Sequence, residues 1–316
     1  MELDAARLRI LVEVAHAGSI AEAARRLSFT PSALSQQLAK LEKELDARLL
    51  ERRATGVLPT AIGAVLVGHG ERVLGELREA RAAVRAAQGN QPQRLALGSF
   101  ATAGKVLVPA ALAALRRRYP RAELSLLDLE PPDGYGRVTS GDLDLLITHR
   151  YPGAPPVPHR GLVREPLSTD PLWLALPAGH RLGDAPDVEL ARLAGESWIS
   201  GAPGVPSRTC LRTLAEQLGI QPHVAYETAD YHVTLALVGA GLGVALVPAS
   251  IFGEVDWGQV SVHRPRDVDP AREIAIVHRR RPPALVVELV ELLRHSAEDV
   301  SRRTPGRGTT PTPPER

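Results

Sequence analysis

Hydrophobic residues in the first part of the chain recur at helical spacing and are interrupted by short polar breaks. The first apolar face predicts a helix that ends at Gly18, because glycine readily adopts the left-handed conformation that closes a helix. Ser19, with Glu22 three residues later, forms a capping box that predicts a short second helix over about 20–27. The first apolar face consists of Leu8, Leu11, Val12 and Ala15.

A third helix follows after a two-residue turn. Thr30 can cap it, and Pro31 takes its first position, where a missing N–H has no cost. The pattern predicts this helix over about 31–45, and a short helix, a tight turn and a second helix form a helix-turn-helix unit. Two extended runs around a glycine-containing turn within 49–60 predict a β-hairpin wing. Residues 1–60 are therefore expected to form a winged helix-turn-helix domain.

The stretch 61–89 is predicted to be one long helix that mediates dimerisation. Its apolar positions alternate between spacings of four and three residues, which is the rhythm of a coiled-coil seam. Two or three heptads are marginal alone, so the seam is expected to need a partner. The seam consists of Leu66, Gly70, Val73, Leu77, Ala80 and Val84, and Leu66, Val73, Leu77 and Val84 are the dimerisation candidates.

Strands then alternate with helices, which predicts an α/β domain over 90–300 in which ligands bind at the carboxyl ends of strands. A proline-rich connection divides it into two similar units with a pocket between them. The first subdomain is expected at about 93–159 and 268–296, and the second at about 160–267. Residues 301–316 are rich in Arg, Thr, Pro and Gly and are expected to be a disordered tail.

Composition narrows the function classes. The formal net charge is +2, so bulk charge alone does not hold this chain on nucleic acid or membrane, although a local basic surface remains compatible with it. The one cysteine, Cys210, excludes an intrachain disulfide and a cysteine zinc site, and the ten histidines show no metal-ligand spacing. With no signal-peptide pattern and no membrane-spanning apolar run, the cytoplasm is the expected compartment and no membrane partner is expected.

Residues 17–38, AGSIAEAARRLSFTPSALSQQL, closely resemble the helix-turn-helix of LysR-type transcriptional regulators. Later segments are also similar to that family: GDLDL at 141–145, GHRL at 179–182 and the glycine-rich stretch within 230–248. The resemblance covers about 2–295. It implies a winged-helix DNA-binding domain, a dimerising linker helix and an effector domain like periplasmic binding proteins, in a protein that usually acts as a tetramer.

Seven residues are the candidates for contact with double-stranded DNA: Thr30, Pro31, Ser32, Ser35, Gln36, Lys40 and Arg52. The first turns of a recognition helix reach base edges in the major groove. Gln36 can bond adenine through two hydrogen bonds, and the two serines can serve either base type. Lys40 is expected on a phosphate. The resemblance places Thr30 and Pro31 at the groove entrance and Arg52 at the root of the wing.

Five residues are the candidates for effector binding: Thr102, Glu130, Ser200, Gly201 and Asp230. Thr102 matches a family position that commonly bonds an effector, and it precedes a helix predicted to begin near Lys105. Ser200 and Gly201 follow a strand and are expected to face the same crevice. Asp230 opens a helix, so a plain N-cap is an equal alternative.

Glu130 departs from the family pattern, because many members carry small hydroxyl residues there. An acidic side chain disfavours an anionic effector unless a cation compensates it. This departure weakens the transfer of the family's usual carboxylate-binding pattern to this chain.

No catalytic constellation is present in the sequence, so the protein is expected not to be an enzyme and to need no cofactor. The glycine-rich stretch 239–243 follows a helix and precedes a strand, the reverse of a dinucleotide-binding loop. Asp142 and Asp144 have no evident third ligand and read as structural rather than as a metal site. Cys210, beside leucines on a predicted helix, reads as buried packing.

The sequence therefore predicts a LysR-type regulator that binds DNA and a small-molecule effector as a homodimer or homotetramer, with RNA polymerase as a candidate partner. The alternative is a small-molecule-binding protein or enzyme whose N-terminal helices mediate only assembly. A DNA-binding protein of architectural role, without an effector, is a second alternative.

Overall fold

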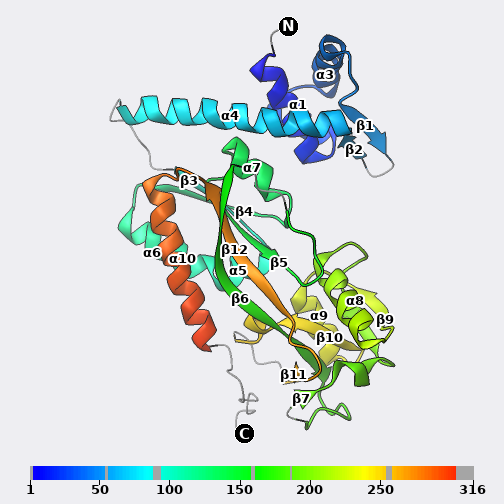
Figure 1. The fold of residues 1–316 in the computed structure, drawn as a ribbon. Helices are drawn as coiled ribbons and strands as arrows, with labels where there is room; N and C mark the ends of the chain where they lie inside the picture. The colour runs from blue at the N-terminus through cyan, green and yellow to red at the C-terminus, as the bar shows by residue number, and fades with distance from the viewer. Residues whose placement is uncertain are drawn as a thin grey trace.

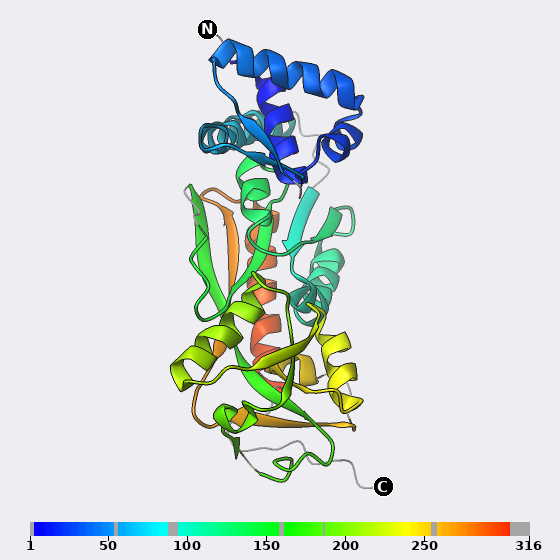
Figure 2. The same ribbon diagram turned by 90° about the vertical axis from the view of Figure 1, so that its right-hand side faces the viewer.

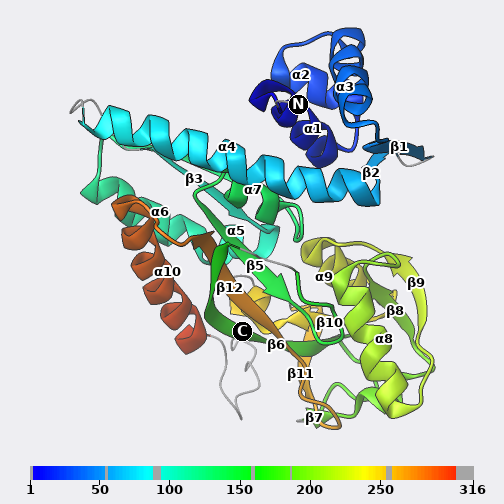
Figure 3. The ribbon, with the colours of Figure 1, turned by 45° about the horizontal axis from the view of Figure 1, so that its top comes forward.

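The computed structural model describes residues 3–53, 56–87, 94–157, 161–185, 187–253 and 258–303 of the chain. The molecule is elongated, with a small N-terminal head at one end and the α/β domain below it (Figures 1 and 2). A long helix lies between them, across the top of the α/β domain (Figure 3).

The head has three helices and a hairpin: α1 (Ala5–Ala17), α2 (Ile20–Leu27), α3 (Pro31–Leu45), β1 (Leu50–Arg53) and β2 (Gly56–Pro59). Its helix ends follow the local signals in the sequence. Gly18 ends α1 in the left-handed conformation with φ 61°, and the Ser19 side chain accepts a hydrogen bond from the Glu22 N–H at 3.4 Å. Thr30 Oγ1 caps α3 by accepting from the Ala33 N–H at 3.2 Å. The expected helix-turn-helix and wing are therefore both present.

The long helix α4 (Ala61–Ala87) has 27 residues and is about 40 Å long at ~1.5 Å per residue. Its start packs against the head so closely that a Cβ on Gly63 would collide with the Leu49 carbonyl. Its middle contacts α7 (Gly134–Ser140) of the α/β domain, where Arg78 bonds the Ser140 carbonyl and Asp142. The helix therefore contacts both the head and the α/β domain.

The α/β domain is built on strands in the order β4-β3-β5-β12-β6-β10-β8-β9, with β11 paired to β6 and β7. The strands are β3 (Arg94–Ser99), β4 (Glu123–Asp128), β5 (Leu145–Arg150), β6 (Leu162–Pro177), β7 (Asp187–Val188), β8 (Ser197–Ser200), β9 (His223–Glu227), β10 (Val244–Pro248), β11 (Val260–Pro265) and β12 (Ala271–Arg279). The helices are α5 (Ala101–Val106), α6 (Val108–Arg118), α7, α8 (Pro206–Leu218), α9 (Tyr231–Gly239) and α10 (Ala284–Arg303), with 3₁₀ turns η1 (Leu190–Leu193) and η2 (Ala249–Gly253).

The two units meet along β6, one long strand shared by both. Its first part, Leu162 to Pro171, pairs with β12, and its next part, Leu172 to Ala175, pairs with β10 of the other unit. The chain therefore changes unit inside β6, near residue 171, later than the expected division at 160. The strand is mostly polar over 163–170 and apolar and buried over 172–176, so its composition changes near this point although the strand itself continues through it.

Two further expectations differ from the structure. The helix predicted to begin near Lys105 is preceded by a further helix: α5 ends at Val106, and α6 begins at Val108 with Pro109 in its first turn, where a missing N–H has no cost. Helix α10 continues to Arg303, so the first residues of the predicted tail are helical; the rest, 304–316, lie outside the described residues. None of the described helices is long and apolar enough to cross a membrane.

Candidate DNA-binding surface and effector cleft

The start of α3 presents a polar surface to solvent. Six of the seven DNA-contact candidates are exposed: Thr30, Pro31, Ser32, Gln36, Lys40 and Arg52. Ser35 is half-buried, and its hydroxyl donates to the Pro31 carbonyl at 2.8 Å, so it is turned toward its own helix. The apolar face of α3 is buried in the head through Leu34, Leu38 and Leu41. The polar first turns are thereby held outward on a rigid element.

Basic residues near α3 differ in whether a carboxylate pairs with them. On α2, Arg25 and Arg26 both bond Glu22, and these hydrogen bonds lower the pKa of Glu22 to about 2. Lys40 and Arg52 have no carboxylate within ion-pair distance among the residues that the structure describes. Lys40 and Arg52 are therefore available for phosphates.

The predicted seam of α4 divides into two parts. In the single chain, the side chains of Val73, Leu77 and Val84 are exposed to solvent by 42%, 46% and 57%. Leu66, in contrast, is half-buried and packs into the core of the head, and Gly70 lies against Val12 of α1. The heptad rhythm did not distinguish these uses, because the same helix face meets α1 at its start and solvent further along.

A cavity of about 570 Å³ opens between the two units of the α/β domain. Of the predicted effector residues, Thr102, Glu130 and Asp230 line it. Ser200 and Gly201 do not belong to its lining within the described chain; Gly201 lies behind it, where a Cβ would come 2.8 Å from Ser207 Oγ. Thr102 is the second residue of α5 rather than a residue before the helix.

On one side of the cleft, Glu130 accepts a hydrogen bond from His149 Nε2 at 2.9 Å. The imidazole ring is buried edge-on between Phe100 and Tyr151, with ring centroids 4.5 Å and 5.2 Å away. Burial lowers the pKa of His149 below its ordinary value of 6.5, so the ring is neutral near pH 7 and donates without adding positive charge.

At the opening of the cleft, Lys105 of α5 meets α9 of the other unit. Its Nζ lies 2.7 Å from His232 Nε2. Asp230 caps α9, because its carboxylate accepts from the backbone N–H of His232 at 2.7 Å and of Val233 at 3.4 Å. Asp230 therefore serves as an N-cap and also lines the cleft, so the two readings of this residue are compatible.

The back of the cleft is a buried polar network. Arg272 is 1% exposed and bonds Asp170 Oδ2 at 2.8 Å and the Tyr151 hydroxyl at 3.2 Å. The Tyr151 hydroxyl also lies 2.6 Å from that of Tyr231, and burial raises the pKa of Tyr151. These hydroxyls join the two units beside the point where β6 passes between them.

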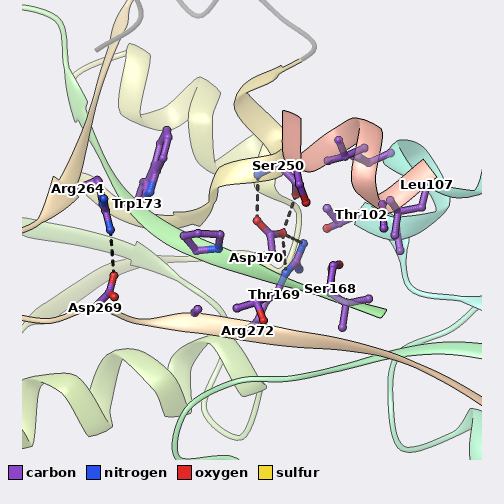
Figure 4. A pocket seen from close by; sticks show the side chains of 18 residues that line it. Thr102, Leu107, Ser168, Thr169, Asp170, Trp173, Ser250, Arg264, Asp269 and Arg272 are labelled. Carbon is purple, nitrogen blue, oxygen red and sulfur yellow. Dashed lines mark hydrogen bonds and ion pairs between the residues drawn. The ribbon is translucent and has the colours of Figure 1, made fainter. Parts of the chain in front are cut away.

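A second cavity of about 380 Å³ lies on the other side of Arg272 (Figure 4). Asp170 points into it and bonds both Arg272 and Ser250, the latter at 2.7 Å, while Arg264 and Asp269 form an ion pair at 3.3 Å further along the wall. Thr102 and Arg272 line both cavities. The two cavities therefore share part of their walls at these two side chains.

The sequence reasoning missed four residues that shape the cleft: Lys105, His149, Tyr151 and Arg272. His149 could have been found, because it lies near the carboxyl end of β5, where ligand-binding residues gather in parallel sheets. The other three carried no local signal; their roles depend on contacts with the second unit.

The two aspartates and the cysteine that the sequence indicated to be structural have surroundings that fit this interpretation. Asp142 bonds Arg78 and Ser140, and Asp144 bonds Arg279 at 2.9 Å. Cys210 is fully buried, and burial raises the pKa of its thiol to about 12, which makes it a poor nucleophile. Within the described ranges, no group of three or more His, Cys, Asp or Glu side chains is arranged to hold a metal ion.

Comparison with known proteins agrees with this architecture. Residues 5–64 match the model of the bacterial regulatory helix-turn-helix of the lysR family, and residues 88–298 match the LysR substrate binding domain. The small neutral protease regulatory protein of Streptomyces coelicolor is 33% identical over 244 residues, 76% of this chain and 72% of that protein.

Solved structures show the same arrangement. Full-length OxyR from Pseudomonas aeruginosa has a TM-score of 0.64 at 23% identity, with 93% of this chain and 98% of that one covered. CbnR in complex with its target DNA has a TM-score of 0.55 at 25% identity, with 93% and 100% covered. The chain belongs to the LysR family of DNA-binding transcriptional regulators, with an N-terminal helix-turn-helix and a C-terminal effector-binding domain.

Proposed function

We propose that the chain reads a specific operator with the first turns of α3, using Ser32 and Gln36 on base edges and Lys40 and Arg52 on the DNA backbone. The observation that carries this proposal is the outward-facing polar surface at the start of α3. Ser35 is a weaker contributor, because it is half-buried and its hydroxyl donates to the Pro31 carbonyl, whereas Ser32 is exposed and its hydroxyl bonds only the neighbouring Thr30 hydroxyl, at 3.2 Å, among the described contacts. Thr30 and Pro31 set the start of the helix at the groove entrance.

The active species is a homodimer or a dimer of dimers. Val73, Leu77 and Val84 on α4 support this, because exposed apolar residues at heptad spacing favour a second helix. Two heads joined in this way place two recognition helices one turn of DNA apart, ~34 Å. Residues 1–60 then serve as the DNA-binding unit and 61–89 as the dimerising unit.

The α/β domain, 90–300, senses a small molecule in the cleft between its two units. A cleft of about 570 Å³ has the size of a metabolite site, and Thr102, Glu130 and Asp230 bring polar groups into it. An effector that binds one arrangement of the units more tightly shifts the oligomer toward it and changes the spacing of the heads. The protein acts in the cytoplasm without catalysis, and RNA polymerase is its partner at the promoter.

The test is a gel shift of the full-length protein against its own upstream DNA, with competitor DNA and a salt series. The double variant Ser32→Ala with Gln36→Ala is expected to weaken specific binding about tenfold or more, because one good base contact contributes ~1–3 kcal/mol. Its salt slope stays unchanged, since no phosphate contact is removed.

The matched control is Gln217→Ala, a change of an exposed glutamine on α8, far along the chain from the head. It is expected to bind DNA like the wild type. A double variant that binds as tightly and as selectively as the wild type refutes the recognition surface. If neither the upstream DNA nor genomic fragments are bound, the alternative in which the head mediates only assembly is favoured.

A further inference from the structure

Four charged side chains line the effector cleft: Lys105, Glu130, Asp230 and Arg272. Arg272 is paired with Asp170 and Asp230 caps α9, whereas Lys105 and Glu130 each bond an imidazole ring rather than a counter-ion. Lys105 Nζ bonds His232 Nε2 at 2.7 Å, and Glu130 bonds His149 Nε2 at 2.9 Å. Among the residues that the structure describes, Lys105 has no carboxylate and Glu130 no Lys or Arg within ion-pair distance. Lys105 and Glu130 both line this one cavity, but they do not form an ion pair with each other.

The Glu130 side of the cleft offers hydrogen-bond acceptors. His149 is neutral near pH 7 because burial lowers its pKa, so it donates through Nε2 and leaves the carboxylate charge uncompensated. The other ring nitrogen, Nδ1, is buried and has no partner among the described residues. With Nε2 protonated, this nitrogen is an acceptor too. A cationic donor such as an ammonium group complements this side.

The Lys105 side has the opposite character. An ammonium group can bond a ring nitrogen only through its lone pair, so His232 accepts there and adds no negative charge. The hydroxyls of Thr102 and Ser207 line the same cavity. Helix α8 also begins there, and its N-terminus has no side-chain cap. Lys105, the hydroxyls and the positive end of the α8 dipole together complement a carboxylate. The Asp230 carboxylate also lines this side, 3.6 Å from His232 Nδ1, but it accepts the N–H groups of His232 and Val233 as the cap of α9.

We infer that the effector is a small zwitterion, with an ammonium group facing Glu130 and a carboxylate facing Lys105. A ligand with only carboxylate groups would leave Glu130 without a counter-charge or would be repelled by it. A ligand with only an amine would be repelled by Lys105. The inference rests on the proposed function, because it assigns a ligand class to the cleft proposed there. The cavity volume of about 570 Å³ lies in the range of small-molecule sites and leaves ample room for an amino acid with its side chain.

The test measures thermal stabilisation of the full-length protein by matched probes. The panel contains the proteinogenic L-amino acids and short ω-amino acids, each beside the acid that lacks its amine and the amine that lacks its carboxylate. L-valine, isovalerate and isobutylamine form one such set. At least one zwitterion is expected to raise Tm, while its two half-molecules at the same concentration do not.

Two variants then test the two ends separately. Glu130→Gln is expected to weaken the zwitterion about fivefold or more and to lose the discrimination against the plain acid. Lys105→Gln is expected to weaken it similarly and to lose the discrimination against the plain amine. Glu298→Gln and Lys43→Gln, which make the same changes at exposed positions outside the cavity, should bind like the wild type.

Three results overturn the inference: no zwitterion raises Tm, a plain acid or dicarboxylate stabilises as well as any zwitterion, or both cleft variants keep wild-type affinity and selectivity. The gel shift separates these failures from failure of the proposed function. A protein that binds its operator but no zwitterion remains a regulator with another effector class. If the protein binds a zwitterion but no DNA, the inferred ligand class stands and the proposed function is refuted.

Discussion

Two cavities lie on either side of Arg272, and they differ in how their charged groups are used. In the smaller cavity, Asp170 pairs with Arg272 at 2.8 Å and Arg264 pairs with Asp269 at 3.3 Å. In the cleft, Lys105 and Glu130 are each held by an imidazole instead. A charge that already has its counter-ion gains little from a ligand, whereas an unpaired charge gains a partner. The comparison indicates that volume alone does not identify a binding site; the state of its charges does.

The largest expected effect comes from removing one member of the buried Asp170–Arg272 ion pair beside the two cavities. Asp170→Ala leaves Arg272 buried without its carboxylate partner, and removal of one member of a buried pair costs about 3–5 kcal/mol. The free energy of unfolding from urea denaturation measures this loss. Asp269→Ala is the control, because Asp269 is 77% exposed and its pair with Arg264 contributes at most ~1 kcal/mol. Equal losses in the two variants contradict the assignment of Asp170 as the structural member.

The second prediction fills each cavity in turn with the same side chain. Ser207→Trp, at the start of α8, is expected to obstruct the cleft and to weaken stabilising zwitterions about tenfold or more. Ser301→Trp, at the end of α10, fills part of the smaller cavity and should leave their affinity unchanged. The measurement is Tm against probe concentration for both variants. Loss of binding in Ser301→Trp alone would reverse the roles of the two cavities.

The smallest effect is a pH dependence that belongs to the cleft. Burial lowers the pKa of His149 in the folded protein below the ordinary 6.5, so the unfolded chain binds more protons once the pH falls below that value. Stability therefore decreases as pH drops from about 7 to about 5, by at most ~1.4 kcal/mol per pH unit for this group.

His149→Gln removes this contribution while keeping a donor for Glu130, so its unfolding free energy should depend less on pH over the same range. His263, whose pKa burial also lowers, remains in the variant and contributes a residual slope. Unfolding free energies at several pH values measure both slopes. An unchanged slope would mean that folding does not lower the pKa of His149, so that the ring gains its proton as readily as in the unfolded chain and becomes a cationic partner for Glu130 as the pH falls.

Much of the head could be predicted from sequence because its signals are local. The Thr30 hydroxyl caps a backbone N–H only three residues away, and Pro31 suits the first position of a helix whatever surrounds it. The same holds for Gly18 at the end of α1. The exposed polar face of α3 followed from helical periodicity alone. These features depend on interactions within one turn of chain, so residue type and spacing suffice to determine them.

The effector cleft depended on tertiary structure. Thr102, Glu130 and Asp230 could be proposed singly from their places in the chain, whereas the pairing of Lys105 with His232 joins residues 127 positions apart. Leu66 and Leu77 share one heptad pattern, and only the packing of α1 against α4 decided which is buried. The sequence by itself determined the family, the helix caps and the exposed polar face of α3. The fold decided which charges meet a counter-ion and which remain for a ligand, because electrostatic pairing acts through space rather than along the chain.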